Sequence, residues 1–392
     1  MPSFAPYDNS PLHTDLVTLR RDLHQHPELG FQEQRTSQIL RERMERLGLP
    51  VRSVAGTGLV ATLKGGKPGP TVMIRAEMDA LPITEASEVL YRSRNLGVMH
   101  ACGHDAHSAV AAAVAARLAE EQSELRGTIK FGFQPAEEIA SGAARMITDG
   151  ALEDPRVDAV VSLHVWQALP VGAVAVARGT LWAAVDDLTL TVHGAAGHGA
   201  LPHEGRDAIV AAAHIVTALQ TAITRSRPPL SPAVLTIGSI QGGTTWNIIA
   251  DRVEMRGTLR TFDPVIRELL LERIRAIGSG VAEALGASCD MTDTYCAPPV
   301  VNHDGLSEIV RAALASTVGD EQVKVAEPAL VGDDFAHFAQ QVPGCLFQVG
   351  SSNSAKGLDH GHHDSRFDID EDCLPIAAAS LEAVIRGALA SL

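Results

Sequence analysis

A thiol and an imidazole lie two residues apart in this chain, at Cys102 and His104 of the segment MHACGHD, residues 99–105. In a turn before a helix, this spacing can aim both side chains at one point. Together they suit a borderline divalent metal such as zinc, nickel, cobalt or manganese. A cysteine beside a histidine can also be a covalent nucleophile, and such residues can merely cap or pack a helix, so other segments must decide.

Residues of the metal-binding type recur where predicted buried strands end. They are Glu77 and Asp79 after residues 71–76, Glu137 and Glu138 after 128–133, His164 at the end of 159–163, and His360, His362 and His363 after 345–350. In open α/β sheets, sites form outside the carboxyl ends of the strands. Four strands that end in this way, together with Cys102 and His104, favour a metal site over isolated capping or surface groups.

The adjacent carboxylates of Glu137 and Glu138 allow a division of labour. One can bind a metal while the other accepts a proton from water that the metal acidifies, and later returns it to a leaving amine. The pair of glutamates therefore favours a metal-dependent hydrolase over an enzyme that uses Cys102 as a nucleophile. Such an enzyme would need neither the second glutamate nor the further histidines. The sequence shows no Gly-x-Ser-x-Gly elbow, phosphate-binding loop or dinucleotide fingerprint, so the usual signals of serine hydrolases, ATP and NAD are missing.

A second polar cluster lies in the middle of the chain. We interpret His193 and His203 as ordinary surface residues. His198 stands between two glycines, which let the backbone approach closely and lift the side chain out. Asn247 follows in the same part of the chain, and Arg260 ends a predicted strand, where its guanidinium could grip a carboxylate with two hydrogen bonds.

The outer parts of the chain alternate between strands and helices. A helix is expected at residues 14–48, and further helices at 105–121 and 374–390 separate the buried strands named above. This order predicts an α/β fold, with a mostly parallel sheet covered by helices on both faces.

The middle of the chain follows another order. We expect a strand at 187–193, a helix at 207–225, strands at 233–240 and 252–261, a helix at 265–285 and a strand at 287–295. The βαββαβ order is typical of a ferredoxin-like α+β domain. We therefore predict a metal-binding catalytic domain of residues 1–183 and 297–392, with a lid and dimerisation domain inserted at 184–296.

Composition limits the classes of partner and location. The 392 residues include 32 Lys and Arg against 47 Asp and Glu, a net charge of −15 that argues against nucleic acid. The Ala/Val-rich stretch at 109–119 contains an arginine and is shorter than the roughly 18 apolar residues that span a membrane. The N-terminus has no basic segment before an apolar run, and the five cysteines are scattered, which predicts a cytoplasmic protein.

Several motifs together resemble those of the dinuclear-metal metallopeptidases of the aminoacylase/carboxypeptidase type. The most similar branch contains the hippurate hydrolases and the indoleacetyl-amino acid amidohydrolases. The resemblance covers nearly the whole chain. Its motifs are RDLHQHPEL at 21–29, RAEMDALP at 75–82, MHACGHD at 99–105, QPAEE at 134–138, GHGALPH at 197–203, GTLRT at 257–261 and DDF at 333–335.

The resemblance implies two divalent metal ions, manganese, zinc, cobalt or nickel, with a bridging thiolate. The implied ligands are Cys102, His104, Glu138, His164 and His363. His363 is preferred to His362 because the family pattern His-x-Pro-x-aromatic places the histidine four residues before Phe367. This chain departs from that pattern at Ser365, which stands where proline is usual, and Ala250 likewise replaces a usual proline.

The resemblance also implies the remaining roles. Glu137 would be the general base and acid, and His198 would stabilise the oxyanion from the partner subunit of a homodimer or higher homo-oligomer formed through the inserted domain. Asn247 and Arg260 would contact the substrate, with Arg260 on its carboxylate.

The expected reaction is hydrolysis of an N-acyl-amino acid to a carboxylic acid and an amino acid. A dipeptidase or carboxypeptidase with the same metals is the first alternative. A non-catalytic protein with structural zinc is the second, and it is less favoured because structural zinc is normally closed by four Cys or His ligands.

Overall fold

The computed structural model describes residues 4, 7–8 and 10–392 of the chain, which divides into two compact units. The first unit comprises Met1–Leu181, Val300–Pro328 and Asp333–Leu392, and the second comprises Trp182–Pro299 and Ala329–Gly332. The segment predicted as an insertion, 184–296, lies within the second unit. The N-terminal stretch that lacks a signal-peptide pattern lies partly outside the described residues.

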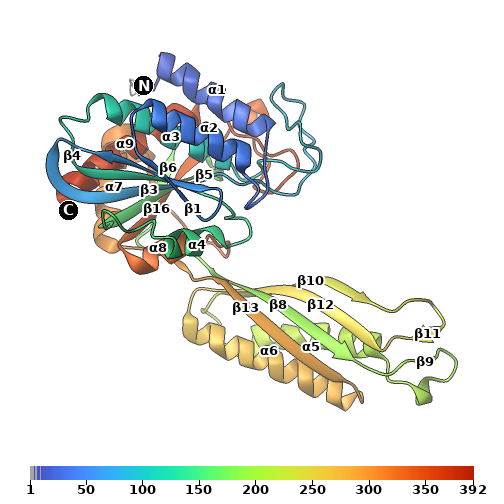
Figure 1. The fold of residues 1–392 in the computed structure, drawn as a ribbon. Coiled ribbons are helices and arrows are strands. Elements are labelled where there is room, and N and C mark those ends of the chain that lie inside the picture. Colours follow the sequence, from blue (N-terminus) through green and yellow to red (C-terminus); the bar gives the residue numbers. More distant parts are fainter. Residues whose placement is uncertain (1–3, 5–6, 9) are drawn as a thin grey trace. The chain divides into compact units, whose positions relative to one another are not determined.

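An eight-stranded mixed sheet forms the centre of the first unit (Figure 1). In spatial order its strands are β1 (Val51–Val54), β2 (Gly58–Lys64), β4 (Arg126–Gln134), β3 (Lys67–Glu77), β5 (Ala159–Pro170), β16 (Gly344–Ser352), β6 (Val174–Val176) and β15 (Val323–Val325). The four central strands, β4, β3, β5 and β16, run parallel to one another, whereas β2 and β6 pair with β4 and β16 in the antiparallel sense. Each central strand contains a long continuous run of buried residues, as expected for strands that are covered on both faces.

Helices cover both faces of this sheet, α3 and α9 on one and α4 and α8 on the other (Figure 1). This arrangement confirms the predicted fold class. The helices of the unit are α1 (Pro11–Gln25), α2 (Gln34–Arg46), α3 (His104–Glu120), α4 (Gly142–Thr148), α7 (Asp304–Val318), α8 (Phe335–Gln341) and α9 (Cys373–Ser391), with short 3-10 turns at Asp320–Gln322 and Ser354–Lys356 and short strands β7 (Gly179–Trp182) and β14 (Val300–Asn302).

The single helix expected at 14–48 is wrong, because the structure has two helices there, α1 and α2. Proline disfavours the helical conformation of the residue before it and cannot donate a backbone hydrogen bond. His26, which precedes Pro27, accordingly leaves the helix with φ −129° and ψ 54°. The connection that follows contacts the candidate site described below.

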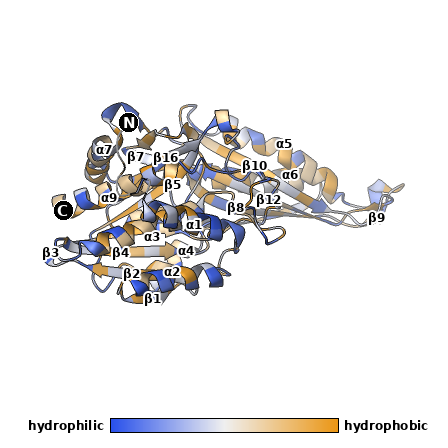
Figure 2. Cartoon of the chain, turned by 90° about the horizontal axis from the view of Figure 1, so that it is seen from above, coloured by the Kyte–Doolittle hydropathy of each residue, from blue (hydrophilic) through white to orange (hydrophobic). Residues whose placement is uncertain are grey.

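The second unit contains a four-stranded antiparallel sheet with helices α5 (Ala208–Arg225) and α6 (Pro264–Ala284). Its strands, in spatial order, are β10 (Ala233–Gly242), β12 (Arg252–Thr261), β8 (Ala184–His193) and β13 (Ser288–Ala297). Buried residues alternate along β8, and both helices show mixed hydrophobic and hydrophilic positions in Figure 2. The order matches the predicted ferredoxin-like pattern, to which the structure adds the short pair β9 (Gly197–His198) and β11 (Ile248–Ile249) and a 3-10 turn at Pro202–Glu204.

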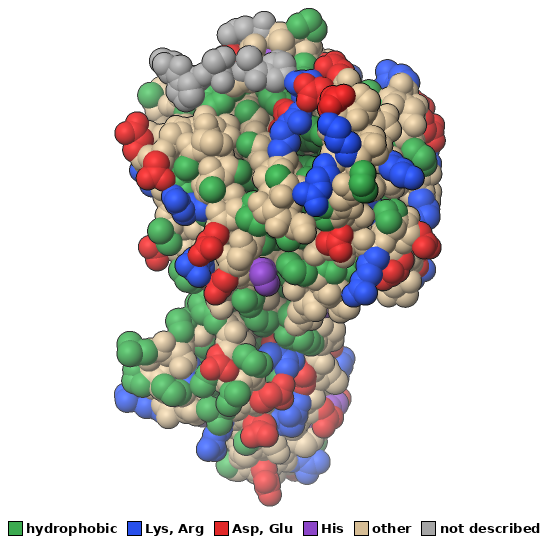
Figure 3. Space-filling model, turned by 90° about the vertical axis from the view of Figure 1, so that its left-hand side faces the viewer, with side chains coloured by type: hydrophobic (Ala, Val, Ile, Leu, Met, Phe, Trp, Pro, Cys, Tyr) green, Lys and Arg blue, Asp and Glu red, His purple; other side chains and the backbone are tan. Residues whose placement is uncertain are grey.

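Helices α5 and α9 are long and apolar enough by composition to cross a membrane, unlike the 109–119 stretch considered above. The apolar residues of α9 belong to the core of the first unit, and those of α5 belong to the core of the second. Core helices of this kind pass the same compositional test, so it is weak evidence for a membrane. On the face drawn in Figure 3, acidic and basic side chains are interspersed.

Candidate active site

The turn that joins Cys102 to His104 begins helix α3. Gly103 adopts the left-handed conformation there, with φ 87°, and an added Cβ would lie 2.3 Å from Val165 Cγ2. Any other residue would be strained at this φ and would push against the Val165 side chain, so glycine suits the turn. The turn brings Cys102 and His104 together with Glu138, whose ligand-type atoms all lie within 4.8 Å of one another.

Asp79 orients the His104 ring. The Nδ1 atom of His104 lies 3.0 Å from the Asp79 carbonyl oxygen and 3.2 Å from its Oδ1, which leaves Nε2 as the metal-binding nitrogen. His104 Nε2 and Glu138 Oε1 are both buried and lie 3.9 Å apart, and neither has a hydrogen-bond partner among the residues that the structure describes. Buried polar atoms are rarely left unpaired, so two such atoms facing each other fit a shared cation.

The electrostatics of these residues also fit a cation. Burial lowers the pKa of His104, but the hydrogen bond and charge of Asp79 outweigh it and raise that pKa to about 10. Burial is the main cause that raises the pKa of Glu138 to about 7. The pKa of His104 is raised by the negative charge around it and that of Glu138 mainly by its burial, and a divalent cation bound here would compensate the charge of the buried carboxylates.

Two further imidazoles lie beside the thiol. The Sγ atom of Cys102 is 3.6 Å from His164 Nε2 and 3.8 Å from His362 Nδ1. The His362 ring is stacked on Trp166 with a centroid separation of 4.9 Å. His363 instead approaches Glu138, with 3.5 Å between His363 Nε2 and Glu138 Oε2. The structure therefore brings all five predicted ligands to one region, and it adds His362 as a second histidine from the same loop.

The environment of Cys102 does not suit a nucleophile. Burial is the main cause that raises the pKa of its thiol well above the usual value, and the charges of Glu138 and Glu137 raise it further. A nucleophilic cysteine needs a lowered pKa, as produced by a nearby cation or a helix N-terminus. Without a cation this thiol stays protonated, whereas a bound divalent ion would stabilise the thiolate, so the surroundings fit Cys102 as a ligand better than as a nucleophile.

Glu137 lies at the edge of the ligand cluster and beside a second acidic pair. Its Oε2 atom is 3.9 Å from His104 Nε2, and its carboxylate lies close to those of Asp333 and Asp334. Burial raises the pKa of Glu137 well above the usual range, and the charge of Asp333 adds to the effect. A carboxylate with a raised pKa, next to but outside a set of ligands, is suited to take up a proton and release it again during a reaction.

Arg75 neutralises the carboxylates behind Glu137. Its guanidinium is fully buried and donates to Asp333 Oδ1 at 2.7 Å, to Asp334 Oδ1 at 3.1 Å and to Glu77. Gln134 at the end of β4 donates to the same oxygen of Asp334 at 2.6 Å. The sequence analysis assigned no role to Arg75, Gln134, Asp333 or Asp334, and the signal that could have found them is that they lie in the motifs at 75–82, 134–138 and 333–335.

One histidine near the cluster is already committed to structural contacts. His107 Nδ1 lies 2.9 Å from Glu77 Oε2, while its Nε2 accepts a hydrogen bond from the Val165 backbone N–H at 2.9 Å. Both ring nitrogens are used, so His107 supports β3 and β5. The Glu77 carboxylate is bound by both His107 and Arg75. These contacts explain why this carboxylate, although it lies at a strand end, does not join the ligands.

The other predicted residues lie in the second unit. His198 pairs with Ile248 across β9 and β11, and Gly199 N–H donates to the Asn247 carbonyl at 2.9 Å, so His198 and Asn247 lie close together. Arg260 lies near the end of β12, and Arg252 begins that strand. At about 3.3 Å per residue, the two arginines are roughly 26 Å apart. The structure therefore does not bring Arg260 together with His198 inside this unit.

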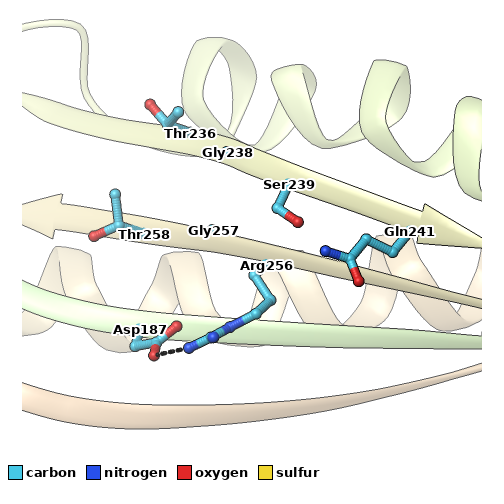
Figure 4. Close-up of a pocket in the computed structure, with 8 residues that line it drawn as sticks. All are labelled: Asp187, Thr236, Gly238, Ser239, Gln241, Arg256, Gly257 and Thr258. Atoms are coloured by element: carbon cyan, nitrogen blue, oxygen red, sulfur yellow. Dashed lines mark hydrogen bonds and ion pairs between the residues drawn. The ribbon is translucent and has the colours of Figure 1, made fainter. Parts of the chain in front are cut away.

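The open face of the sheet in the second unit is polar. A hollow of about 350 Å³ is lined by Asp187, Thr236, Gly238, Ser239, Gln241, Arg256, Gly257 and Thr258. Asp187 and Arg256 point toward each other and form an ion pair at 3.0 Å (Figure 4). None of the predicted site residues lines this hollow.

Comparison with known proteins gives a consistent family. The model of peptidase family M20/M25/M40 matches residues 73–387. The N-acetyl-L-cysteine deacetylase of Bacillus subtilis (strain 168) is 38% identical, over 94% of this chain and 87% of its own length. Thermostable carboxypeptidase 2 of Saccharolobus solfataricus is also 38% identical, over 93% of this chain and 92% of its own length.

A solved structure with the same fold is the YXEP protein of Bacillus subtilis, which is described as a dinuclear metal binding peptidase from the M20 family. It is 34% identical to this chain, with a TM-score of 0.81 and coverage of 97% of this chain and 99% of that one. The buried cysteine, histidine and glutamate cluster described above is likewise compatible with two metal ions.

Proposed function

Because the chain belongs to peptidase family M20/M25/M40 and is a hydrolase, we propose that it cleaves the amide bond of N-acyl-amino acids, including hippurate-like conjugates. The products are a carboxylic acid and an amino acid. One observation carries the proposal: the unpartnered buried atoms of His104 and Glu138 face each other beside a second carboxylate, that of Glu137.

Five side chains would hold the two metal ions: Cys102, His104, Glu138, His164 and His363, with His362 as the alternative to His363. Bound divalent ions, such as manganese or zinc, supply Lewis acidity toward the amide carbonyl and the attacking water.

Glu137 carries the proton through the reaction. Its carboxylate takes the proton from the attacking water and then gives it to the departing nitrogen, so the same atom acts as base and acid. The raised pKa of Glu137 supports this role, because a strongly acidic carboxylic acid would hold the proton too weakly to deliver it. Arg260 would bind the substrate carboxylate, Asn247 would contact the substrate, and His198 would stabilise the oxyanion.

The proposed assembly is a homodimer formed through the second unit, as the lid and dimerisation domain, in which His198 acts on the partner's site. The placement of the two residues supports this arrangement: His198 pairs with β11, which leads into the Arg252 end of β12, whereas Arg260 lies near the other end of that strand. Two residues so far apart would serve one substrate if different chains supply them. The proposed location is the cytoplasm, which the five free cysteines support.

The test compares substrates and metals. Purified protein is analysed for metal content and assayed with N-acetyl, N-benzoyl and indoleacetyl amino acids and with dipeptides, before and after chelation. We expect about two divalent ions per chain, hydrolysis of acyl-amino acids, and loss of activity that returns with manganese or zinc. Activity on dipeptides alone would favour the second candidate, a dipeptidase or carboxypeptidase, which the 38% identity to a carboxypeptidase supports.

A further inference from the structure

The loop that carries both glutamates turns sharply after β4. Ala136 adopts a left-handed conformation there, with φ 54°, although it has a Cβ atom. Such a conformation is uncommon for residues other than glycine and persists only where the surroundings hold it. The carbonyl of Ala136 accepts hydrogen bonds from Ser141 N–H at 3.1 Å and Gly142 N–H at 3.2 Å. The hydrogen-bond partner of the Ala136 N–H therefore helps to determine the orientation of Glu137 and Glu138, which follow it.

The partner of that N–H is a carboxylate from a distant part of the sequence. Glu33 Oε1 accepts the Ala136 N–H at 2.9 Å, and Glu33 Oε2 accepts the Thr57 hydroxyl at 2.6 Å. Glu33 is fully buried, and no ion pair to it is found among the described residues. Burying a carboxylate costs free energy unless hydrogen bonds compensate. The burial of Glu33 therefore calls for a structural or functional explanation.

Stabilising helix α2 does not explain Glu33. Glu33 occupies the position just before α2, but its side chain makes no hydrogen bond to the helix N-terminus. Glu28 does that instead, because its two carboxylate oxygens accept the N–H groups of Arg35 at 3.0 Å and Thr36 at 2.8 Å. The two glutamates of this connection thus have different roles. The side chain of Glu28 binds the start of α2, and that of Glu33 binds the loop after β4.

The same connection is shaped to lie against the loop. A Cβ added at Gly30 would lie 3.0 Å from Ala136 Cα and 3.1 Å from its Cβ, so the glycine permits a close approach. The Glu28 carbonyl also accepts the Ala80 N–H at 2.9 Å. Ala80 follows Asp79, which orients His104 and accepts the Glu138 N–H at 3.0 Å. The connection between α1 and α2 therefore braces both segments behind the candidate active site.

We propose that Glu33 is a positioning residue, which fixes the Ala136 turn and thereby holds Glu137 and Glu138 in their working orientations. The inference rests on the proposed function of those two glutamates. It predicts that the hydrogen-bond acceptor at this position, rather than its negative charge, is what turnover requires.

Glu33→Leu and Glu33→Gln separate these possibilities. Leucine fills the space but cannot accept the Ala136 N–H, so we expect kcat to fall roughly 10- to 100-fold with KM little changed, as for a misplaced catalytic group. Glutamine can accept from Ala136 with its oxygen and donate to Thr57 with its nitrogen, so we expect it to restore kcat to within about threefold of wild type. Glu28→Ala is the matched control, because it removes two hydrogen bonds to α2, and it should lower Tm without lowering kcat.

Hydrogen exchange of residues 134–141, followed by mass spectrometry, provides a readout that does not depend on turnover. We expect faster exchange in Glu33→Leu and wild-type exchange in Glu28→Ala. If Glu33→Leu does not fold, Glu33→Asp serves instead, since its carboxylate is one methylene too short to reach Ala136. Wild-type kcat and wild-type exchange in the folded variant would overturn the proposal.

The outcomes also separate this inference from the proposed function. A wild-type protein that hydrolyses neither acyl-amino acids nor dipeptides would overturn the proposed function, while the exchange measurement would still decide whether Glu33 holds the loop. Hydrolysis by the wild type, with unchanged turnover in Glu33→Leu, would overturn only the positioning role.

Discussion

Two neighbouring glutamates of similar chemistry differ in what surrounds them, and this difference separates their roles. Glu138 presents an unpartnered buried oxygen to His104 Nε2 at 3.9 Å, which is what a metal ligand requires. Glu137 faces Asp333 and Asp334, and their negative charge raises its pKa beyond the effect of burial alone. A ligand needs a lone pair near the cation, whereas a base needs a proton affinity matched to its task.

Replacing each glutamate by glutamine therefore has different expected effects. Glu137→Gln retains size but cannot carry a proton, so we expect kcat to fall roughly 100- to 10,000-fold while metal content stays at the wild-type level. Glu138→Gln should lose metal as well as activity. Elemental analysis and steady-state kinetics on both variants check this, and wild-type turnover in Glu137→Gln would contradict its role as the base.

A buried histidine outside the ligand cluster makes stability depend on pH. Burial lowers the pKa of His24, but the charge of Asp105, whose Oδ2 lies 2.8 Å from His24 Nδ1, outweighs it and raises that pKa to about 9. Arg20 opposes this shift, and a hydrogen bond to Glu85 supports it. Because the folded-state pKa exceeds the unfolded value of about 6.5, the stabilisation is complete below pH 6.5 and is lost as pH rises through 9.

Urea unfolding at pH 6, 7.5 and 9.5 measures this dependence. We expect the wild type to lose up to about 3 kcal/mol more unfolding free energy across the range than His24→Gln does. His214→Gln, at an exposed position of α5, is the control and should follow the wild type. Parallel curves for wild type and His24→Gln would show that His24 is not protonated in the folded protein at neutral pH.

At the scale of elements, one arginine connects three segments behind the site. Arg75 on β3 binds Asp333 and Asp334, which precede α8, and its Nε donates to Gln134 Oε1 at the end of β4 at 2.8 Å. Removing one partner of a buried charge network leaves the others uncompensated. The ends of β3 and β4 and the start of α8 therefore depend on this guanidinium for their packing.

Arg75→Met tests this connection. We expect the variant to lose about 3–5 kcal/mol of unfolding free energy, because three buried carboxylates lose their counter-charge. Arg21→Met is the matched control, since Arg21 pairs with Glu371 on the surface, and its loss should cost about 1 kcal/mol or less. Similar midpoints in chemical denaturation for both variants would contradict the role of Arg75.

Strands and helices with a continuous or periodic pattern of buried residues could be predicted from the sequence. Contacts between segments that are far apart in the chain could not. The strands at 71–76 and 128–133 are apolar runs, so they could be located without knowledge of their neighbours. The contacts of Glu33 with Ala136 and of Arg75 with Gln134 join residues more than 50 positions apart, and no local pattern in the sequence indicates them. The choice between His362 and His363 depends on an irregular loop, where no periodicity indicates which side chain turns inward.

At the scale of the whole molecule, the proposed assembly predicts that activity depends on a second chain. Arg260 lies roughly 26 Å along β12 from Arg252 by strand geometry, and His198 pairs with β11, which leads into the Arg252 end of that strand. A twofold assembly can supply the same two residues to one site from different subunits. Strictly monomeric protein should then be nearly inactive, which size-exclusion chromatography with light scattering and a dilution series of the activity would reveal.

Mixing two inactive variants gives the decisive form of this prediction. His198→Ala keeps Glu137, and Glu137→Gln keeps His198, so a mixed dimer contains one site with both groups intact. Random exchange of equal amounts places half of the chains in mixed dimers and should restore about a quarter of wild-type activity, because half of their sites are complete. Mixing Glu137→Gln with Glu138→Gln is the control and should restore nothing, since both glutamates come from the same loop of one chain. Full subunit exchange without recovery in the first mixture would instead place His198 and Glu137 in a site built by a single chain.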